Sequence, residues 1–451
     1  MSLLVKNAAA IVTCDDADRV LKNASLYCEG GVVTALGNTC PQTADEVLDG
    51  TGMLVYPGLV NTHHHLYQMF SRNIPQAQGL ALFDWLRYLY KIWAGLNEDV
   101  VRLSTLCGAG QLLKYGCTTV FDHHYVFPQN CGDLIGAQFE AAARLGVRFS
   151  ASRGSMDRSV KDGGLPPDSV VQTVDEILRD SRRLIETYHN PRPGSMRTVA
   201  LAPCSPFSVS ADLMRQTAAL ARASGVRLHT HLGETRDEER WCLETVGMRP
   251  YDYLESLGWT GPDVWLAHCI YVNQEEIRRM AASGTGVAHC PVSNMKLSSG
   301  VMNLPAMRKA GVKVSLAVDG SASNDGSDML DELRCAYLVH RLTWGADAPD
   351  GYALLKTACR GGADVLGRSD IGSLQTGKCA DFFMIDSRLL DLAGSDIDPG
   401  SMLAAVGYHR PVDATVVGGK VAVRGGRLTG IDEEQTAAEA RACVRRYLAN
   451  L

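Results

Sequence analysis

The sequence predicts an α/β fold: a (β/α)8 TIM-like barrel with a small β-sandwich domain formed from both termini. Between about residues 58 and 365, eight short apolar runs alternate with longer amphipathic runs. Stretches rich in β-forming residues and in Gly and Asp/Asn turns flank this region on both sides. Eight consecutive strand–helix units are typical of the barrel. Histidine or aspartate ends five of the eight apolar runs, which is where barrel enzymes place catalytic groups.

Residues 1–57 and 366–432 are expected to build the small domain. Their strand-like stretches, separated by Gly turns, occupy 2–13, 23–37, 46–58, 379–387 and 414–430. The two separated β-rich segments are predicted to pair with each other in one small sandwich. Residues 433–451 have helical composition and spacing, so we expect a C-terminal helix there.

Residues 58–365 are expected to form the barrel. Its candidate strands lie within 54–65, 116–124, 146–154, 198–208, 225–234, 264–270, 284–294 and 312–321. Helical patterns separate several of these strands, and the helix expected over 211–225 has Ser210 as its N-cap. The Gly- and Pro-rich stretch 156–169 is predicted to be a loop at the active face of the barrel.

The composition favours a protein with a small-molecule partner. The formal net charge is −6, from 44 basic and 50 acidic residues, and no basic stripe of the kind that binds nucleic acid is present. No stretch approaches the roughly 20 apolar residues of a membrane span, and we expect no signal peptide. The 14 cysteines include no CxxC pair, which is typical of reduced, buried thiols and predicts a cytoplasmic location.

His63 and His65 suggest a metal site. In a strand, residues two apart point to the same side, so both imidazoles face the barrel interior while His64 faces out. Two imidazoles at this spacing suit a divalent metal ion. The alternative is a His-rich loop with ordinary hydrogen bonds, and the other polar residues favour the metal.

Further polar residues end the fifth, sixth and eighth candidate strands. His229 and His231 face the same way, and Glu234 follows them, where a carboxylate can carry protons. The alternative is a helix-capping glutamate beside core histidines. His268 ends the sixth strand, and Asp319 ends the apolar eighth strand. An unpaired carboxylate is costly there, so Asp319 needs a metal ion or a hydrogen-bond partner.

Together these motifs resemble the amidohydrolase superfamily, and more narrowly its cytosine/guanine deaminase and triazine hydrolase branch. The resemblance covers nearly the whole chain, including PGLVNTHHH (57–65), HTHLGE (229–234) and DGSASND (319–325). It implies one divalent metal ion, zinc foremost and iron as the alternative, held by His63, His65, His231 and Asp319. It also implies that His268 contacts the water or the substrate, and that Glu234 and Asp319 move protons. His229 lies outside the implied ligand set, as a support for the ligands or a packing residue.

The resemblance further implies the reaction. Members with two metal ions carry a bridging lysine at the end of the fourth strand, and 198–208 contains none, which implies a mononuclear deaminase of an amino-substituted nitrogen heterocycle. Segments 61–68, 122–128 and 201–209 most closely resemble bacterial enzymes that convert 8-oxoguanine to urate and ammonia. The alternative substrates are isoxanthopterin, guanine or a hydroxytriazine with an alkylamine or chloride leaving group. A non-catalytic scaffold is the remote alternative. Because relatives commonly associate, the resemblance also implies a homo-oligomer.

Three residues are expected to contact the substrate. Gln68 offers a donor–acceptor pair to a ring edge, and Arg153 can donate to a carbonyl oxygen. His123 ends the second strand and is expected to reach the same pocket. The alternatives are a helix-surface position for Gln68 and a structural salt bridge for Arg153.

Three other positions near the expected pocket are interpreted from the same patterns. Trp85 is interpreted as a packing residue rather than as a pocket wall. The resemblance leads us to expect glycine at position 269 and serine at position 292, where this chain has Cys269 and Val292. Both positions are expected near the pocket, where they would influence the choice of substrate.

Overall fold

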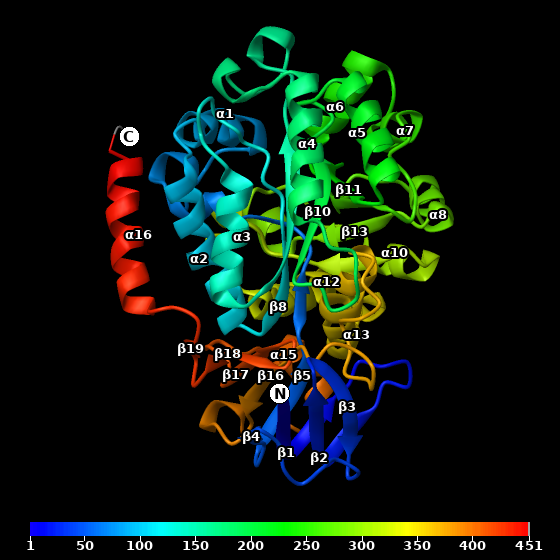
Figure 1. The fold of residues 1–451 in the computed structure, drawn as a ribbon. Coiled ribbons are helices and arrows are strands. Elements are labelled where there is room, and N and C mark those ends of the chain that lie inside the picture. The colour runs from blue at the N-terminus through cyan, green and yellow to red at the C-terminus, as the bar shows by residue number, and fades with distance from the viewer. Residues whose placement is uncertain (450–451) are drawn as a thin grey trace.

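Eight parallel strands form a barrel at the centre of the molecule (Figure 1). The structure is a computed structural model and describes residues 1–449. The hydrogen-bonded order is β14-β13-β12-β11-β10-β9-β8-β6. These strands span Leu59–Asn61 (β6), Cys117–Asp122 (β8), Arg148–Ser155 (β9), Arg197–Pro203 (β10), Arg227–Leu232 (β11), Val264–His268 (β12), Gly286–His289 (β13) and Val314–Leu316 (β14). The predicted α/β barrel is therefore confirmed.

Two short strands close the barrel at its carboxyl end. β7 (His64–His65) pairs in parallel with β15 (Asp319–Gly320), with His64 opposite Asp319. Next to this pair, the Val318 N–H donates to Asn61 Oδ1 at 2.9 Å. The closure therefore brings the HxH segment beside the aspartate of the last strand, although the two are far apart in the sequence.

The predicted first barrel strand, 54–65, is divided between the two domains. β5 (Met53–Pro57) lies in the sheet that the two chain ends form. β6 lies in the barrel sheet, and β7 pairs with β15 at the end of the barrel. Gly58 marks the division, because a Cβ atom there would lie 2.0 Å from Thr118 Oγ1. Only glycine lets the backbone pass this close to β8. The sequence pattern does not reveal the break because β5 and β6 are buried throughout.

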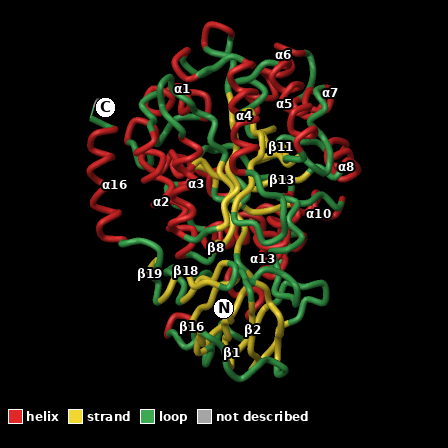
Figure 2. Tube along the Cα trace, viewed as in Figure 1, coloured by secondary structure: helices red, strands yellow, loops and turns green. Residues whose placement is uncertain are grey.

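Helices cover the outside of the barrel between successive strands (Figure 2). They span Glu98–Lys114 (α2), Leu134–Leu145 (α3), Val174–Tyr188 (α4), Ala211–Ser224 (α5), Arg236–Val246 (α6), Pro250–Ser256 (α7), Gln274–Ser283 (α8), Leu304–Ala310 (α10) and Met329–Trp344 (α12). The Leu213 N–H donates to Ser210 Oγ at 3.1 Å, which confirms the predicted N-cap of α5. The stretch 156–169 follows β9 at the carboxyl end of the barrel and contains the 3-10 turn Val160–Asp162.

Shorter helices complete the fold, and several of them carry residues of the site. They span Leu82–Trp93 (α1), Pro291–Lys296 (α9), Ser321–Asn324 (α11), Gly351–Lys356 (α13), Gly362–Val365 (α14) and Pro399–Ala405 (α15), with the 3-10 helix η1 at Leu66–Phe70. Of these, η1, α9 and α11 follow β7, β13 and β15 directly, so they begin at the carboxyl end of the barrel.

Both ends of the chain form one mixed sheet at the bottom of Figure 1, where the blue N-terminal strands lie beside the orange C-terminal ones. Its order is β19-β18-β17-β16-β5-β1-β2-β3, with β4 paired to β1. The strands span Ser2–Val12 (β1), Val20–Glu29 (β2), Val32–Gly37 (β3), Glu46–Asp49 (β4), Phe382–Asp386 (β16), Ala414–Val417 (β17), Lys420–Arg424 (β18) and Arg427–Leu428 (β19). A separate hydrophobic core, which includes Leu26, Val55 and Phe382, supports the sheet. We propose 1–57 with 366–432, and 58–365, as the domain boundaries.

The C-terminal helix α16 (Glu433–Tyr447) packs beside α2, as Figure 1 shows in red. The Lys114 Nζ on α2 lies 2.7 Å from Glu433 Oε2 at the start of α16. This helix was predicted over 433–451, of which residues 450–451 lie outside the described residues. Within residues 1–449, no helix has both the length and the apolar character that a membrane span requires.

Candidate active site

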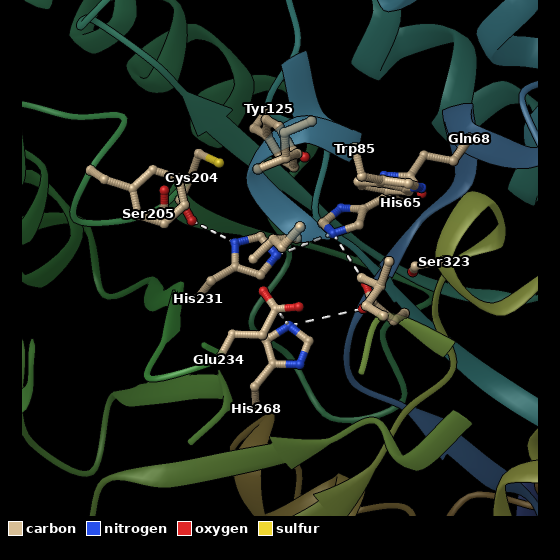
Figure 3. Close-up of a pocket in the computed structure, with 15 residues that line it drawn as sticks. His65, Gln68, Trp85, Tyr125, Cys204, Ser205, His231, Glu234, His268 and Ser323 are labelled. Atoms are coloured by element: carbon tan, nitrogen blue, oxygen red, sulfur yellow. Dashed lines mark hydrogen bonds and ion pairs between the residues drawn. The ribbon is translucent and has the colours of Figure 1, made fainter. Parts of the chain in front are cut away.

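A buried cluster of histidines and carboxylates lies at the carboxyl end of the barrel. Figure 3 shows the imidazoles of His65, His231 and His268 and the carboxylate of Glu234 close together, with Asp319 lining the same pocket. The pocket is lined by His65, Gln68, Leu82, Trp85, Leu86, Tyr125, Cys204, Ser205, Phe207, His231, Glu234, His268, Leu297, Asp319 and Ser323. The strand ends predicted to carry the chemistry therefore meet at one pocket.

The four predicted metal ligands each place one atom close to an atom of another ligand. Asp319 Oδ1 lies 3.2 Å from His63 Nε2 and 3.2 Å from His65 Nε2. His65 Nε2 in turn lies 3.2 Å from His231 Nε2. In a tetrahedral site with metal–ligand distances of about 2.0–2.1 Å, neighbouring ligand atoms are about 3.3 Å apart. The observed spacings fit a divalent metal ion.

The hydrogen bonds of the rings show that these nitrogens carry lone pairs. His65 Nδ1 donates to the His123 carbonyl oxygen at 2.7 Å, and His231 Nδ1 donates to the Cys204 carbonyl oxygen at 2.6 Å. A neutral imidazole has only one N–H, so Nε2 of each ring has none. Two lone pairs facing each other repel unless a cation lies between them. His63 Nε2 is also buried without a hydrogen-bond partner among the described residues, which supports the same interpretation.

Asp319 is held ionised and in a fixed orientation. Burial would raise the pKa of Asp319, but the electrostatic effect of His63 holds it well below its usual value. The Ser293 Oγ donates to Oδ2 at 2.6 Å, and the Gly320 N–H donates to Oδ1 at 2.7 Å. The backbone of Asp319 is left-handed, with φ at 64°, so its conformation is strained.

His268 and Glu234 lie on the other side of Asp319. His268 Nε2 is 3.6 Å from Glu234 Oε2 and 3.9 Å from Asp319 Oδ2. Burial opposes the charge on His268, but these two carboxylates raise its pKa above the usual value. Burial, together with the charge of Asp319, raises the pKa of Glu234. A carboxyl group with a raised pKa beside a hydrogen-bonding imidazole is suited to proton transfer.

Residues that sequence reasoning missed hold these groups in place. Asn294 Oδ1 accepts from His268 Nδ1 at 2.9 Å, and Ser293 holds Asp319 as described above. Both lie on α9, directly after β13, so the HCPVSN stretch was the signal that could have identified them. Glu238 is also buried, and its carboxylate accepts the N–H groups of Gly233 and Glu234 at 2.9 and 3.0 Å.

Of the three expected substrate contacts, only Gln68 lines the pocket. Its Oε1 accepts from the Ala322 N–H at 3.3 Å, so Gln68 is held inward rather than exposed on a helix surface. His123 lies behind the pocket lining and donates from Nε2 to the Ala202 carbonyl oxygen at 2.8 Å. A His123 nitrogen nevertheless lies within 4.8 Å of the ligand atoms of His63, His65 and His231, so its contact with the substrate stays a prediction.

Arg153 is likewise absent from the pocket lining of the described residues. Its guanidinium is buried in the protein, with Nε 2.6 Å from Asp180 Oδ2 and Nη2 2.7 Å from Gln172 Oε1. It also lies 3.8 Å above the ring of Phe127. A buried guanidinium needs such partners to offset its lost hydration, so Arg153 has the structural role that was the alternative interpretation.

Three further positions lie at or near the pocket. Trp85 lines the pocket and also packs in the core against Trp93, as its interpretation as a packing residue predicts. Cys269 and Val292 are absent from the pocket lining in the described residues. Cys269 has a left-handed backbone with φ at 49°, which explains why glycine is the expected residue there. His64 faces away from the site as predicted, with Nε2 2.9 Å from Ser327 Oγ.

Comparison with known proteins identifies the class. Residues 54–422 match the amidohydrolase family, so the chain belongs to this family and is a hydrolase of its superfamily. The chain is 43% identical over 448 residues to 8-oxoguanine deaminase of Pseudomonas aeruginosa, with 99% of each chain covered. It is 40% identical over 454 residues to hydroxydechloroatrazine ethylaminohydrolase of Pseudomonas sp. strain ADP, with 97% of this chain and 94% of the relative covered.

A solved structure agrees with the architecture as a whole. Atrazine chlorohydrolase from Arthrobacter aurescens TC1, complexed with zinc, superposes with a TM-score of 0.95 at 33% identity. The match covers 98% of this chain and 100% of that chain. The resemblance inferred from the motifs is therefore confirmed.

Proposed function

We propose that this protein is a hydrolytic deaminase that converts 8-oxoguanine to urate and ammonia. The observation that carries the proposal is the convergence of the lone pairs of His63, His65 and His231 with Asp319, beside Glu234 and His268, in one buried pocket. The similarity to an 8-oxoguanine deaminase over nearly the full length of both chains supports the choice of substrate. The close approach of all four predicted ligands argues against a non-catalytic scaffold.

One divalent ion, zinc foremost and iron as the alternative, is proposed as the cofactor. His63, His65, His231 and Asp319 would hold it, because their ligand atoms have the spacing of a tetrahedral site. When bound, such an ion supplies Lewis-acid activation of a water molecule near neutral pH. The zinc complex of the structurally similar chlorohydrolase supports zinc.

The chain's own carboxylates would move the protons. Asp319 Oδ2 faces His268 and would accept the proton of the attacking water as its oxygen bonds to C2 of the purine. Glu234, whose pKa burial raises, would hold a proton and deliver it to a ring nitrogen. The amino group then takes the proton held by Asp319, the C2–N bond breaks with release of ammonia, and the new C2 hydroxyl returns a proton to Glu234. His268, fixed by Asn294, would orient the water and stabilise developing negative charge.

The pocket lining favours a neutral, planar ring. Trp85, Leu82 and Phe207 provide apolar surface, and Gln68 and Ser205 provide hydrogen-bonding groups. Among the described lining residues there is no Lys or Arg, so the pocket offers no partner for a phosphate or carboxylate group. Isoxanthopterin, guanine and hydroxytriazines share this neutral, planar character and remain the alternative substrates.

Ammonia release from the zinc-loaded protein tests the substrate. We expect turnover of 8-oxoguanine to urate with a higher kcat/KM than for guanine, isoguanine, isoxanthopterin or a hydroxytriazine. Coupled detection of ammonia, with urate followed by its absorbance, measures both products. Turnover of another ring alone would keep the deaminase chemistry and reject the purine assignment. No turnover of any ring by protein with zinc bound would reject the deaminase.

Replacing Gln68 with leucine is expected to lower kcat/KM for 8-oxoguanine by about 10–100-fold, equivalent to one lost hydrogen bond in a buried site. The zinc content should not change, because Gln68 is outside the ligand cluster. The matched control is Arg153→Lys, which should lower thermal stability but keep kcat/KM within about tenfold, because Arg153 bonds to Asp180 and Gln172. A larger kinetic effect in the Arg153 variant than in the Gln68 variant would contradict this assignment.

The cellular location and the oligomeric state of the protein are also proposed. All 14 cysteines lie in the described part of the chain and are free, which suits the reducing cytoplasm. A homo-oligomer is proposed because related enzymes commonly associate. Sedimentation of the purified protein would determine its oligomeric state.

A further inference from the structure

His229 is a buried histidine behind the candidate metal site that the proposed chemistry does not use. Its Nδ1 lies 2.9 Å from the Trp265 carbonyl oxygen, and its Nε2 lies 2.8 Å from Nδ1 of His63. A carbonyl oxygen can only accept, so Nδ1 of His229 carries a proton. The ring is fully buried against Trp265 and Phe121. A neutral imidazole has one N–H, which His229 uses at Nδ1, so its Nε2 accepts a hydrogen bond from Nδ1 of His63.

This bond determines which nitrogen of His63 has the lone pair. Because His63 donates from Nδ1, its Nε2 has no proton and faces Asp319 Oδ1 at 3.2 Å. His65 and His231 reach the same state by donating to backbone carbonyl oxygens. His63 differs because its acceptor is a side chain, which a substitution can remove.

We propose that His229 is a positioning residue that fixes the tautomer and orientation of His63 and so sets the affinity of the site for its divalent ion. The inference rests on the proposed function in one respect, the assignment of His63 as a metal ligand. The position of the His229 ring is itself restrained. It stacks on Trp265, with ring centroids 4.5 Å apart and planes 25° apart, and meets Phe121 edge-on at 5.0 Å.

Amide and aliphatic replacements of His229 separate this role from simple packing. His229→Gln can accept from His63 with its oxygen and donate to Trp265 with its nitrogen, so it can replace both bonds. His229→Leu removes both hydrogen bonds. His229→Asn keeps a polar group, but its shorter side chain cannot bond to Trp265 and His63 at the same time. Competition with a zinc chelator should show about 10–100-fold weaker zinc binding for the Leu and Asn variants. The Gln variant should stay within a few-fold of the wild type.

The matched control is His340→Leu. His340 and His289 form the same kind of buried bond, with their Nε2 atoms 3.0 Å apart, but neither lies among the predicted ligands. This variant should bind zinc as the wild type does, and thermal denaturation of the metal-free proteins shows which variants fold. If the Leu variant does not fold, the Asn and Gln pair still decides the proposal.

Two outcomes would overturn the inference: wild-type zinc affinity in the His229→Asn or Leu variant, or equal loss of affinity in the Gln and Asn variants. Zinc affinity is measured without substrate, so it is independent of the ring that the enzyme acts on. If no ring is turned over while the zinc results follow the expectation, the deaminase proposal fails and the role of His229 stands. If the wild type binds no zinc, both fail.

Discussion

Asp319→Asn is expected to lose most of the catalytic activity and to bind zinc more weakly. The asparagine side chain has the same size but lacks the negative charge and cannot accept the proton of the attacking water. Loss of proton transfer alone should lower kcat/KM by about 10²–10⁴-fold. Zinc binding should weaken because Asp319 Oδ1 lies 3.2 Å from both His63 Nε2 and His65 Nε2. Steady-state ammonia release and the zinc content after dialysis measure the two effects.

A second buried carboxyl group separates the loss of a ligand from the replacement of a buried carboxyl group by an amide. Glu332 is buried on α12 and accepts from the Val292 N–H at 3.2 Å and from Asn324 Nδ2 at 2.6 Å. Burial raises its pKa well above the usual range, and Glu332→Gln keeps the size of the side chain, although its amide nitrogen must face one of these two N–H donors. This variant should keep its zinc and stay within about tenfold of the wild-type kcat/KM. If Asp319→Asn shows wild-type kinetics and zinc content, Asp319 is neither a metal ligand nor the proton acceptor.

The candidate ligands were predictable because they are polar, titratable side chains in or next to apolar strands. His63 and His65 share one side of a strand through the two-residue period, and Asp319 follows an apolar run in which an unpaired carboxylate is costly. These local facts, with the rule that barrel strands converge at their carboxyl ends, place the residues near one another. The spacing of their ligand atoms could only come from the structure.

The pocket wall was harder to predict because it depends on segments that cross from other parts of the chain. The sequence shows that Arg153 ends a strand, but not that Asp180 on α4 lies beside its guanidinium. Trp85 lies on α1, outside the regular strand–helix repeat, so no periodicity indicates that it reaches the pocket. The role of Ser293 could not be predicted for the same reason, because it depends on a contact between α9 and Asp319 on β15.

Glu234→Gln is expected to lower kcat by about 10²–10⁴-fold while the zinc content stays at the wild-type level. Glutamine keeps the shape of the side chain but cannot deliver a proton to the ring. Glu234 lies outside the two groups of residues whose atoms cluster closely enough to hold a metal ion, so zinc should be retained. Single-turnover kinetics together with metal analysis of the same sample would measure both quantities.

The pH dependence of kcat adds a second, independent readout for Glu234. Burial raises the pKa of Glu234, and the proposed step needs its protonated form. Wild-type kcat should therefore be highest below this pKa and fall as the pH rises through it, whereas the Gln variant should lack that fall.

Ser299→Ala is the control, because it removes only the 3.4 Å hydrogen bond from Ser299 Oγ to Glu234 Oε1 and leaves the carboxyl group in place. It should keep the fall in kcat, shifted to higher pH because the Ser299 hydrogen bond lowers the pKa of Glu234, and lose less than about tenfold in kcat. A Gln variant with the same pH dependence as the wild type would show that another group delivers the proton, and His268, 3.6 Å away, would be the first to replace.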